Sequence, residues 1–408
     1  MLGVKTAALP ASLRRTNQRT VISLLLRLGR ASRADLAKAA GISQPTAGKI
    51  TTELLRLGII QQAGSAAEGL GNGNGGHSRL GRPGQLLRLD VQHRRFLAIE
   101  LGVAETCVSA LPVAVRLEDR WTYSFRTPKS PEAWLDRLRT AVQGQDASQL
   151  WGVLVSVPGI VDEQAGTVLF SPNLHWLEKT RLPELLRSVW DLPVVLVQEI
   201  RALALGHLTA EPGGEDFLLI DFGQGVGGAV VLDGELFSQP IPLNGELGHT
   251  PVAGNLRRCG CGARGCLETL VSESGLLEGF ATSQKIARKG LQPSWRSFVA
   301  HVNGSGLDPW LQEALDATAR VVAGALNVLG VRRVVLTGRL TEMPACISYL
   351  RAQVQKGAVW GRFGEITCQA APHHRAAGLV AAGLDRLVLP TDNDAGAIGP
   401  NLCLARTA

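Results

Sequence analysis

The spacing of hydrophobic residues changes near residue 95 and divides the chain into two parts. Before that point hydrophobic residues recur at helical intervals between glycines, which predicts three short helices. Ser32 and Ser43 stand where helix N-caps are expected, and Gly29 and Gly41 stand where two of the helices end. The second and third helices, joined by a short turn with glycine, are typical of a helix-turn-helix. The three helices are expected at residues 13–28, 33–40 and 44–57.

A β-hairpin with a long tip is expected after these helices. Residues 59–62 and 85–89 suit its two strands, and residues 63–84, rich in Gly, Asn and Ser, suit a flexible wing. Three helices and a hairpin predict a winged helix-turn-helix DNA-binding domain over residues 13–89. Its third helix would enter the major groove of DNA and its wing a minor groove. The expected DNA contacts are Gln44, Thr46 and Lys49 of that helix and Arg79 and Arg82 of the wing.

The second part of the chain alternates short apolar runs with longer amphipathic stretches. This alternation predicts layers of helix and sheet over residues 95–390, followed by a tail at 391–408. It does not by itself distinguish a two-lobed domain from a doubly wound one. Strands are expected at residues 96–101, 151–157, 194–197, 217–220 and 333–336, and helices at 131–142, 200–208 and 309–329.

Charge separates the two parts further. Residues 1–95 hold 15 Lys and Arg against 4 Asp and Glu, whereas the remainder holds 27 against 31. A basic small domain on a mildly acidic large one points to nucleic acid as the partner of the small domain only. The alternative is a small helical domain used for dimerisation or protein docking. That role needs neither the basic excess nor the Arg82-Pro83 turn in a Gly-rich wing.

Length and composition narrow the class of protein. A chain of 408 residues with 45% hydrophobic residues has room for two or three domains. No run approaches the roughly 18 apolar residues that cross a bilayer, and no signal peptide is recognised. The seven cysteines include four scattered ones and fit a reducing compartment better than a disulfide framework. We therefore expect a cytoplasmic protein without a membrane partner.

His249, Cys259, Cys261 and Cys266 lie close together in a Gly-rich stretch. One nitrogen and three sulfur ligands suit tetrahedral zinc, and the intervening glycines let the backbone fold around an ion. We expect a structural zinc site that fixes this loop and holds Glu246 and Glu268 at its edges. The alternative is three reduced cysteines and an unrelated histidine. The other histidines considered match no ligand spacing, and no role is expected for them: His175, His207, His373 and His374.

The sequence also carries a resemblance to a known family. Glu246-Leu-Gly-His249, followed by Cys259-Gly-Cys261-Gly-Ala-Arg-Gly-Cys266-Leu-Glu268, resembles the zinc loop of the ROK family of repressors, open reading frames and sugar kinases. Residues 13–89 resemble the DNA-binding domain of ROK repressors through Arg14-Arg-Thr-Asn17, Gly41-Ile-Ser43 and Gly81-Arg-Pro83. The resemblance implies an actin-like sugar-kinase fold whose two lobes divide near residues 210–216. It also implies zinc at the four ligands and sugar contacts from Asn173, Glu199, Glu246, His249 and Glu268.

The phosphate contacts of a ROK kinase are altered in this chain. Where the family has Asp-x-Gly-Gly-Thr, this chain has Glu100-Leu-Gly-Val103-Ala-Glu105, which loses a glycine and a hydroxyl and gains a charge. Where the family has Asn-Asp, with the Asp as catalytic base, this chain has Gln198-Glu199. A carboxylate displaced by about 1 Å can cost roughly 100-fold in rate. The Gly-rich turn at residues 223–228 is kept, while Thr337-Gly338 matches half of a second glycine turn. We expect sugar binding without ATP and without phosphorylation.

The sequence therefore predicts a sugar-responsive transcriptional regulator, a repressor rather than an activator, which is not an enzyme. It would bind operator DNA as a homodimer or higher homo-oligomer, reading two half-sites about 34 Å apart or a multiple of that distance. One alternative is an ATP-dependent, glucokinase-like sugar kinase that carries a DNA-binding domain, and ADP production with a hexose or pentose would favour it. The other is a DNA-bound scaffold that has lost effector binding, which the absence of stabilisation by any sugar would favour.

Overall fold

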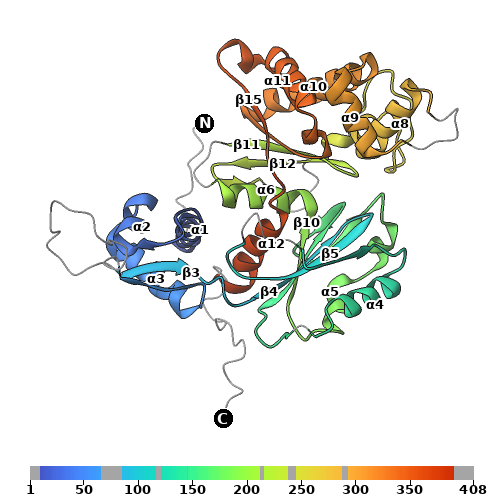
Figure 1. Ribbon diagram of the computed structural model, residues 1–408. Helices are drawn as coiled ribbons and strands as arrows, with labels where there is room; N and C mark the ends of the chain where they lie inside the picture. The colour runs from blue at the N-terminus through green and yellow to red at the C-terminus, as the bar shows by residue number, and fades with distance from the viewer. Residues whose placement is uncertain are drawn as a thin grey trace, which may run out of the picture.

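The computed structural model describes residues 10–65, 85–115, 121–144, 146–211, 216–237, 245–286 and 293–389. These residues form a small N-terminal domain and a larger domain of two lobes (Figure 1). In the view of Figure 1 the small domain lies at the left, one lobe at the lower right and the other at the top. None of the helices in the described part of the chain is long and apolar enough to cross a membrane.

The N-terminal domain packs three helices against a three-stranded sheet. The helices are α1 (Pro10–Leu28), α2 (Arg33–Ala40) and α3 (Gln44–Arg56). The serine caps form as expected, since Ser32 accepts a hydrogen bond from the backbone N–H of Asp35 and Ser43 from that of Thr46. The sheet has the order β1–β3–β2, from strands Ala31–Ser32, Gln85–Leu89 and Ile60–Ser65.

The first lobe is built on a five-stranded sheet of order β10–β7–β4–β5–β6. Strands β4, β7 and β10 run parallel, and β5 and β6 extend the sheet with antiparallel strands. Helices α4 (Pro131–Ala141) and α5 (Leu182–Arg187) and the hairpin of β8 (Ile160–Asp162) and β9 (Thr167–Phe170) complete the lobe. The strand bounds are Phe96–Leu101 (β4), Glu105–Leu111 (β5), Tyr123–Arg126 (β6), Gly152–Val157 (β7) and Val194–Gln198 (β10).

The second lobe repeats this topology. Its sheet has the order β13–β12–β11–β14–β15, with β11, β14 and β15 parallel and β12 and β13 antiparallel. The strands are Phe217–Phe222 (β11), Val226–Leu232 (β12), Glu235–Leu236 (β13), Arg333–Gly338 (β14) and Thr367–Ala370 (β15). The helices are α7 (Glu268–Val271), α8 (Glu273–Ser283), α9 (Trp295–Ser305), α10 (Pro309–Leu329) and α11 (Pro344–Gly357).

Two helices link the lobes and pack against each other at the centre of the molecule (Figure 1). α6 (Glu199–Ala210) leads from β10 of the first lobe towards β11 of the second. α12 (Arg375–Gly383) follows β15 of the second lobe and returns to pack on β4 and β7 of the first. Their contact is close, because a Cβ at Gly378 would lie 1.8 Å from the carbonyl oxygen of Ala202. The two helices can approach this far only because position 378 is glycine.

The N-terminal domain shares a hydrophobic core with the first lobe. One cluster of buried side chains contains Val21 and Leu25 of α1, Leu154 of β7 and Leu379 of α12. Continuous apolar packing of this kind joins the two bodies more firmly than a flexible linker would. A movement within the first lobe or of α12 would therefore displace α1 as well.

Candidate functional site

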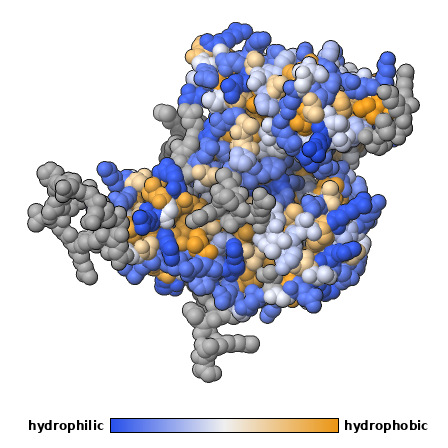
Figure 2. All heavy atoms as spheres, viewed as in Figure 1, coloured by the Kyte–Doolittle hydropathy of each residue, from blue (hydrophilic) through white to orange (hydrophobic). Residues whose placement is uncertain are grey.

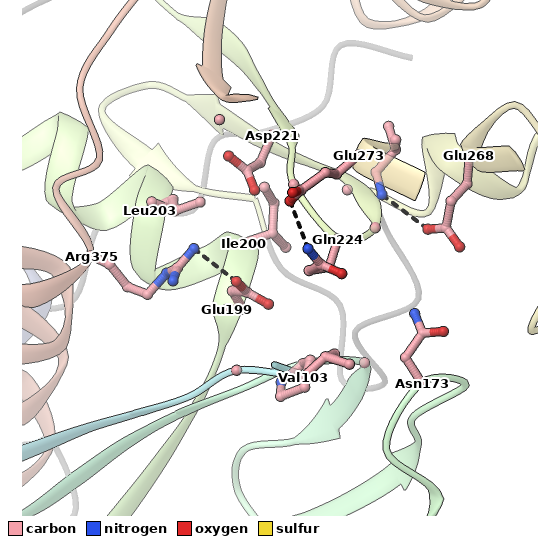
Figure 3. A pocket seen from close by; sticks show the side chains of 18 of the residues that line it. Val103, Asn173, Glu199, Ile200, Leu203, Asp221, Gln224, Glu268, Glu273 and Arg375 are labelled. Atoms are coloured by element: carbon pink, nitrogen blue, oxygen red, sulfur yellow. Dashed lines mark hydrogen bonds and ion pairs between the residues drawn. The ribbon is translucent and has the colours of Figure 1, made fainter. Parts of the chain in front are cut away.

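A cleft of about 680 Å³ opens between the two lobes and is lined by residues from both. The space-filling view shows a hollow between the upper and lower parts of the large domain, with hydrophilic residues beside it (Figure 2). Close up, Val103 and Asn173 approach from the first lobe, while Asp221, Gln224, Glu268 and Glu273 approach from the second (Figure 3). Glu199 and Arg375 reach the cleft from the N-terminal ends of α6 and α12.

Glu199 is the carboxylate at the start of α6, and a third of its side chain is exposed to the cleft. Burial raises the pKa of this carboxyl to about 7, the charge of Asp221 adds to the rise, and His373 opposes it. Asp221 itself, at the end of β11, accepts a hydrogen bond from Oγ1 of Thr337 at 2.6 Å and lies 2.8 Å from Nε2 of His373. Burial lowers the pKa of His373, but the hydrogen bond to Asp221 and the charges of Asp221 and Glu199 outweigh burial and raise it.

Arg375 is a cation buried among the carboxylates of the cleft. Its guanidinium pairs with Glu100 of β4 and, at 2.8 Å, with Glu199 of α6. Only 7% of its side chain is exposed, and burial lowers its pKa to about 10. A buried guanidinium with two carboxylate partners holds both of them in place. Arg375 therefore fixes the direction in which Glu199 presents its carboxylate to the cleft.

The Gly-rich turn between β11 and β12 is held by Glu268. One carboxylate oxygen of Glu268 accepts the backbone N–H of Val226 at 2.9 Å, and a Cβ at Gly225 would lie 2.8 Å from that oxygen. Gln224 of the same turn donates a hydrogen bond to Glu273 at 2.7 Å (Figure 3). The turn thus packs against acidic side chains, an environment that repels a polyphosphate.

The four predicted zinc ligands come together at the edge of the cleft. The ligand atoms of His249, Cys259, Cys261 and Cys266 all lie within 4.8 Å of one another. Sγ of Cys261 lies 3.7 Å from Sγ of Cys266, and Sγ of Cys259 lies 3.5 Å from Nδ1 of His249. Zn–S bonds of about 2.3 Å in a tetrahedron place two sulfurs about 3.8 Å apart. The donor set and its spacing therefore fit a tetrahedral metal ion.

His249 links this cluster to the cleft. Its Nδ1 faces the thiols, and its Nε2 lies 3.7 Å from a carboxylate oxygen of Glu246. Burial raises the pKa of the Glu246 carboxyl, and the charge of Glu268 raises it further while His249 lowers it. A metal ion on Nδ1 would leave Nε2–H as a donor towards Glu246 or a ligand. One imidazole can thus serve both roles that the sequence assigns to it.

The metal-ligand loop also contacts the first lobe. A Cβ at Gly260, between two of the cysteines, would lie 3.3 Å from Oδ1 of Asn173 and 3.4 Å from Cβ of Pro172. Asn173 follows β9 and lines the cleft. The loop therefore closes the cleft by meeting Asn173 from the opposite lobe.

The five residues expected to bind sugar line this one cleft: Asn173, Glu199, Glu246, His249 and Glu268. That they contact a sugar stays a prediction. Sequence reasoning missed several further polar residues of the cleft, among them Asp221, His373 and Arg375. His373 was expected to have no role, yet it pairs with Asp221. The sequence contains little indication of a role for His373 and Arg375, because they follow the last strand of the domain and belong to no recognisable motif.

In the N-terminal domain the exposed face of α3 carries part of the expected DNA contacts. Gln44 and Lys49 are exposed, whereas Ala47, Ile50 and Leu54 are buried. The hydroxyl of Thr46 lies 2.8 Å from that of Ser43, so it takes part in the helix cap. Thr52 and Arg56 are exposed on the same helix. The two predicted wing contacts, Arg79 and Arg82, lie outside the described residues.

The chain is similar in sequence to a known protein family and to several named relatives. The model of the ROK family matches residues 96–384. A xylose repressor from Caldicellulosiruptor bescii is 27% identical over 294 residues, covering 70% of each chain. The xylose repressor of Bacillus subtilis is 23% identical over 92% of this chain and 95% of its own length. The N-acetylglucosamine repressor of Escherichia coli O157:H7 is 24% identical over 83% of this chain and 86% of its own.

Solved structures share the fold. A ROK family transcriptional regulator, a homologue of the Escherichia coli MLC protein, matches with a TM-score of 0.66 and 20% identity over 91% of this chain and 96% of its own. A ROK family glucokinase from Streptomyces griseus, solved with glucose and AMPPNP, matches with a TM-score of 0.56 and 22% identity. That match covers 70% of this chain and 97% of the glucokinase. The two-lobed domain is therefore the actin-like α/β fold of these kinases, and the kinase match leaves nearly a third of this chain uncovered.

Proposed function

The chain belongs to the ROK family, and we propose that it is a DNA-binding transcriptional regulator, a repressor whose operator affinity is set by a sugar. The observation that carries this proposal is a basic N-terminal domain whose hydrophobic core continues into the first lobe of a domain with a carboxylate-lined cleft. Relatives that match along almost the whole chain are named as sugar repressors. A kinase whose own length is 97% matched accounts for only 70% of this chain.

Residues 13–89 would be a winged helix-turn-helix domain with α3 in the major groove. Gln44 and Lys49 are presented to solvent on α3, while Thr46 is half-buried and its hydroxyl shares a hydrogen bond with Ser43, which leaves it fewer free sites for DNA. Helix-turn-helix proteins read symmetric operators as dimers, so a homodimer on an inverted repeat is the expected complex. Arg79 and Arg82 are proposed as minor-groove contacts of the wing on the sequence alone.

Residues 95–390 would bind the sugar between the lobes, which divide near residues 210–216. A polyol needs several directional acceptors, and carboxylates that accept two hydroxyls each supply them. Asn173 would contact the sugar from the first lobe, Glu199 from the hinge, and Glu246, His249 and Glu268 from the second lobe. Hydroxyls that bridge the lobes favour the closed arrangement, so sugar binding would close the cleft.

The same cleft is poorly equipped for phosphoryl transfer. The turn after β4 has the branched side chain of Val103 where the family has a glycine that lets a phosphate approach backbone N–H groups, and it has Ala104 where the family has a hydroxyl. Glu105 follows with an added negative charge, and all three residues line the cleft. Glu199, at the position of the catalytic base, is paired with Arg375. A triphosphate would approach the charges of Glu105 and Asp221 as well. We therefore propose that the cleft binds sugar without ATP and without phosphorylating it.

The metal ion of this domain is proposed to be structural zinc. His249, Cys259, Cys261 and Cys266 would hold it, since three thiolates and one imidazole form a closed tetrahedral set without an open position. When bound, the ion supplies a rigid loop and no chemistry on the sugar. A rigid loop would fix the positions of the residues that face the sugar. Glu246 and Glu268 contact the metal ligands, and Gly260 of the loop contacts Asn173 of the other lobe.

The test is selection of genomic DNA fragments by the purified full-length protein, repeated in the presence of a pool of hexoses, pentoses and amino sugars. Enrichment of one inverted repeat, lost when the pool is added, is the expected result. A repeat that is enriched equally with and without sugar would support a scaffold that has lost effector binding. If no fragment is enriched at low salt and ADP forms with a sugar of the pool, the protein is a kinase instead.

A further inference from the structure

Helix α12 has one end in the sugar cleft and the other at the DNA-binding domain. Its first residue, Arg375, pairs with Glu100 and Glu199 in the cleft. Asp385, just after its last turn, pairs with Arg19 of α1. At 1.5 Å per residue the two ends are about 15 Å apart. The helix thus spans the distance between the two functional parts of the chain (Figure 1).

The contact at the DNA-binding end is specific in geometry. Nε of Arg19 donates to Oδ1 of Asp385 at 2.7 Å, and Nη2 of Arg19 lies 2.7 Å from Oδ2 of Asp385. Two parallel hydrogen bonds from one guanidinium fix both distance and orientation. Arg19 also lies 3.9 Å from Glu235 of the second lobe. These polar contacts with α12 and, more weakly, with β13 add an orientation to the hydrophobic packing that already holds α1 against the first lobe.

The contact at the cleft end depends on a residue that a sugar would use. Glu199 is shared, because its carboxylate accepts from Arg375 and a third of its side chain faces the cleft. A sugar hydroxyl that donates to Glu199 bonds to the same carboxylate that Arg375 holds through one oxygen, and so changes the strength and geometry of that ion pair. Arg375 is 93% buried and keeps Glu100 as its other partner, so it cannot simply turn to solvent. A change in this ion pair is therefore passed to the first turn of α12, which carries Arg375.

α12 cannot respond alone, because it moves together with α6. A Cβ at Gly206 of α6 would lie 1.9 Å from the carbonyl oxygen of His374, the residue before Arg375, so neither helix can slide freely past the other. Close packing of this kind transmits a displacement instead of absorbing it. The pair of helices carries both partners of the ion pair, Glu199 on one and Arg375 on the other.

Space for such a shift exists beside the DNA-binding domain. A second cavity, of about 1060 Å³, lies between α1, the first lobe and the start of α12. Glu100, His373 and Arg375 line both this cavity and the sugar cleft. On the far side the cavity is lined by the last turn of α1, from Leu25 to Leu28, and by Arg30. Arg375 and its neighbours are thus the wall between the sugar cleft and the interface with α1.

From these contacts we propose that Arg375 is a positioning residue whose place depends on whether a sugar is bound in the cleft. A displacement of Arg375 moves α12, and α12 moves α1 through the Arg19–Asp385 pair. The inference rests on the proposed function, since it names the regulation of the same sugar site. In the empty cleft Arg375 holds Glu199 and α12 fixes α1. When a sugar hydroxyl donates a hydrogen bond to Glu199, the first turn of α12 moves towards the second cavity and the orientation of α1 changes with it.

The experiment measures coupling, which is the ratio of operator dissociation constants with and without sugar. The operator is the genomic fragment that the wild-type protein selects, and the probes are D-xylose, D-glucose and N-acetylglucosamine, tested singly. Allosteric coupling of this kind is worth about 5- to 150-fold. In Arg19→Gln and Asp385→Asn we expect sugar affinity in the absence of DNA to stay within about twofold, while the coupling ratio falls towards one. Arg375→Lys should lower both the sugar affinity and the coupling, because lysine lacks the fork that holds two carboxylates.

Matched controls separate coupling from general damage. Arg181→Gln removes an exposed ion pair with Glu184 on α5, far from α12, and should leave the coupling at the wild-type value. If Arg375→Lys does not fold, the two variants at the other end decide the question alone. Wild-type coupling in Arg19→Gln and Asp385→Asn would overturn the inference while leaving the regulator intact. A wild-type protein that ignores all sugars on its operator would instead overturn the proposed function.

Discussion

Nδ1 of His249 lies 3.5 Å from Sγ of Cys259, and the opposite nitrogen of the same ring lies 3.7 Å from Glu246. The ring therefore joins the thiol cluster to the acidic wall of the cleft. The loop that carries the thiols meets Asn173 of the other lobe at Gly260. Loss of the metal ion would then affect more than local stability, because the side chains that face the sugar are attached to the same loop.

The first prediction concerns this metal site. Cys261→Ala should lose zinc and melt at a lower temperature, since structural zinc contributes on the order of 10 kcal/mol of apparent binding energy. Sugar affinity should fall with it, because Glu246 and Glu268 lose their anchor. Metal analysis of the purified protein and calorimetric melting measure both effects. Cys107→Ala, a half-buried cysteine outside the cluster, is the control and should keep one zinc per chain. A chelated protein that melts like the native one would contradict the assignment.

The second prediction concerns the close contact of α6 and α12. Gly378→Ala places a methyl group where the carbonyl oxygen of Ala202 lies 1.8 Å away, so the helices must separate. Overpacking of this kind costs about 1–3 kcal/mol, and unfolding in denaturant measures it. Gly324→Ala, at an exposed position of α10, is the matched control, since nothing lies within 4 Å of its added Cβ. That control should be stabilising by about 0.5–1 kcal/mol. Equal stability of the two variants would show that the helices are not in contact.

The third prediction follows from the raised pKa of Glu199, which lies near 7 in the folded protein against an ordinary value of 4.5. Between these values the folded protein keeps a proton that the unfolded chain has lost. The contribution of Glu199 to stability is therefore fully present below about pH 4.5 and is lost as the pH rises towards 7. Glu199→Gln should flatten this decline, which melting temperatures at about pH 5 and 8 would show. Glu184→Gln, exposed on α5, is the control and should leave the decline unchanged. The same slope in the wild type and Glu199→Gln would mean that Glu199 is ionised throughout.

The small domain could be predicted in some detail because its signals are local. Ser32, Ser43 and Gly41 cap helices within a few residues of themselves, and the structure forms those caps. The strand Ala31–Ser32 was missed, since two residues carry no periodic pattern and pair only with the distant β3. The spacing of apolar runs likewise did not predict that the two lobes share one topology. Apolar runs do not specify which strands pair, and β5 and β12 enter their sheets by antiparallel pairing with β4 and β11.

The cleft shows the same division between local and long-range information. His249 and the three cysteines lie in one short stretch, so their spacing indicated a common site, and the structure gathers them. Arg375 could not be assigned, because Glu100 and Glu199 are brought to it by strands and helices from both halves of the chain. A sequence pattern reveals neighbours within one segment. It does not reveal a guanidinium that is buried by the meeting of three segments.

The fourth prediction concerns phosphoryl transfer. With ATP and a panel of hexoses and pentoses, the protein should release no ADP, and ATP should not raise its melting temperature. The reason is the crowding of carboxylates in the cleft, which is lined by Glu105, Asp221 and Glu273. The guanidinium of Arg339, which also lines the cleft, is already paired with Glu273 at 3.5 Å. A sugar of the same panel that raises the melting temperature without ATP serves as the internal control. ADP release above that of Glu199→Gln would establish a kinase.

The last prediction concerns the exposed face of α3. Each phosphate contact of a DNA-binding protein adds about 0.9 to the slope of log affinity against log salt. Lys49→Ala should therefore weaken operator and random DNA alike and reduce that slope by about one. Gln44→Ala, by contrast, should leave the slope unchanged and relax base preference at one position, because an amide reads base edges without releasing counterions. Fluorescence anisotropy over a salt series measures both. Lys129→Ala removes an exposed lysine from the large domain, so its slope should equal that of the wild type. If Lys49→Ala and Lys129→Ala share one slope, α3 does not lie along the phosphate backbone at Lys49, and the recognition surface must be sought elsewhere on the domain.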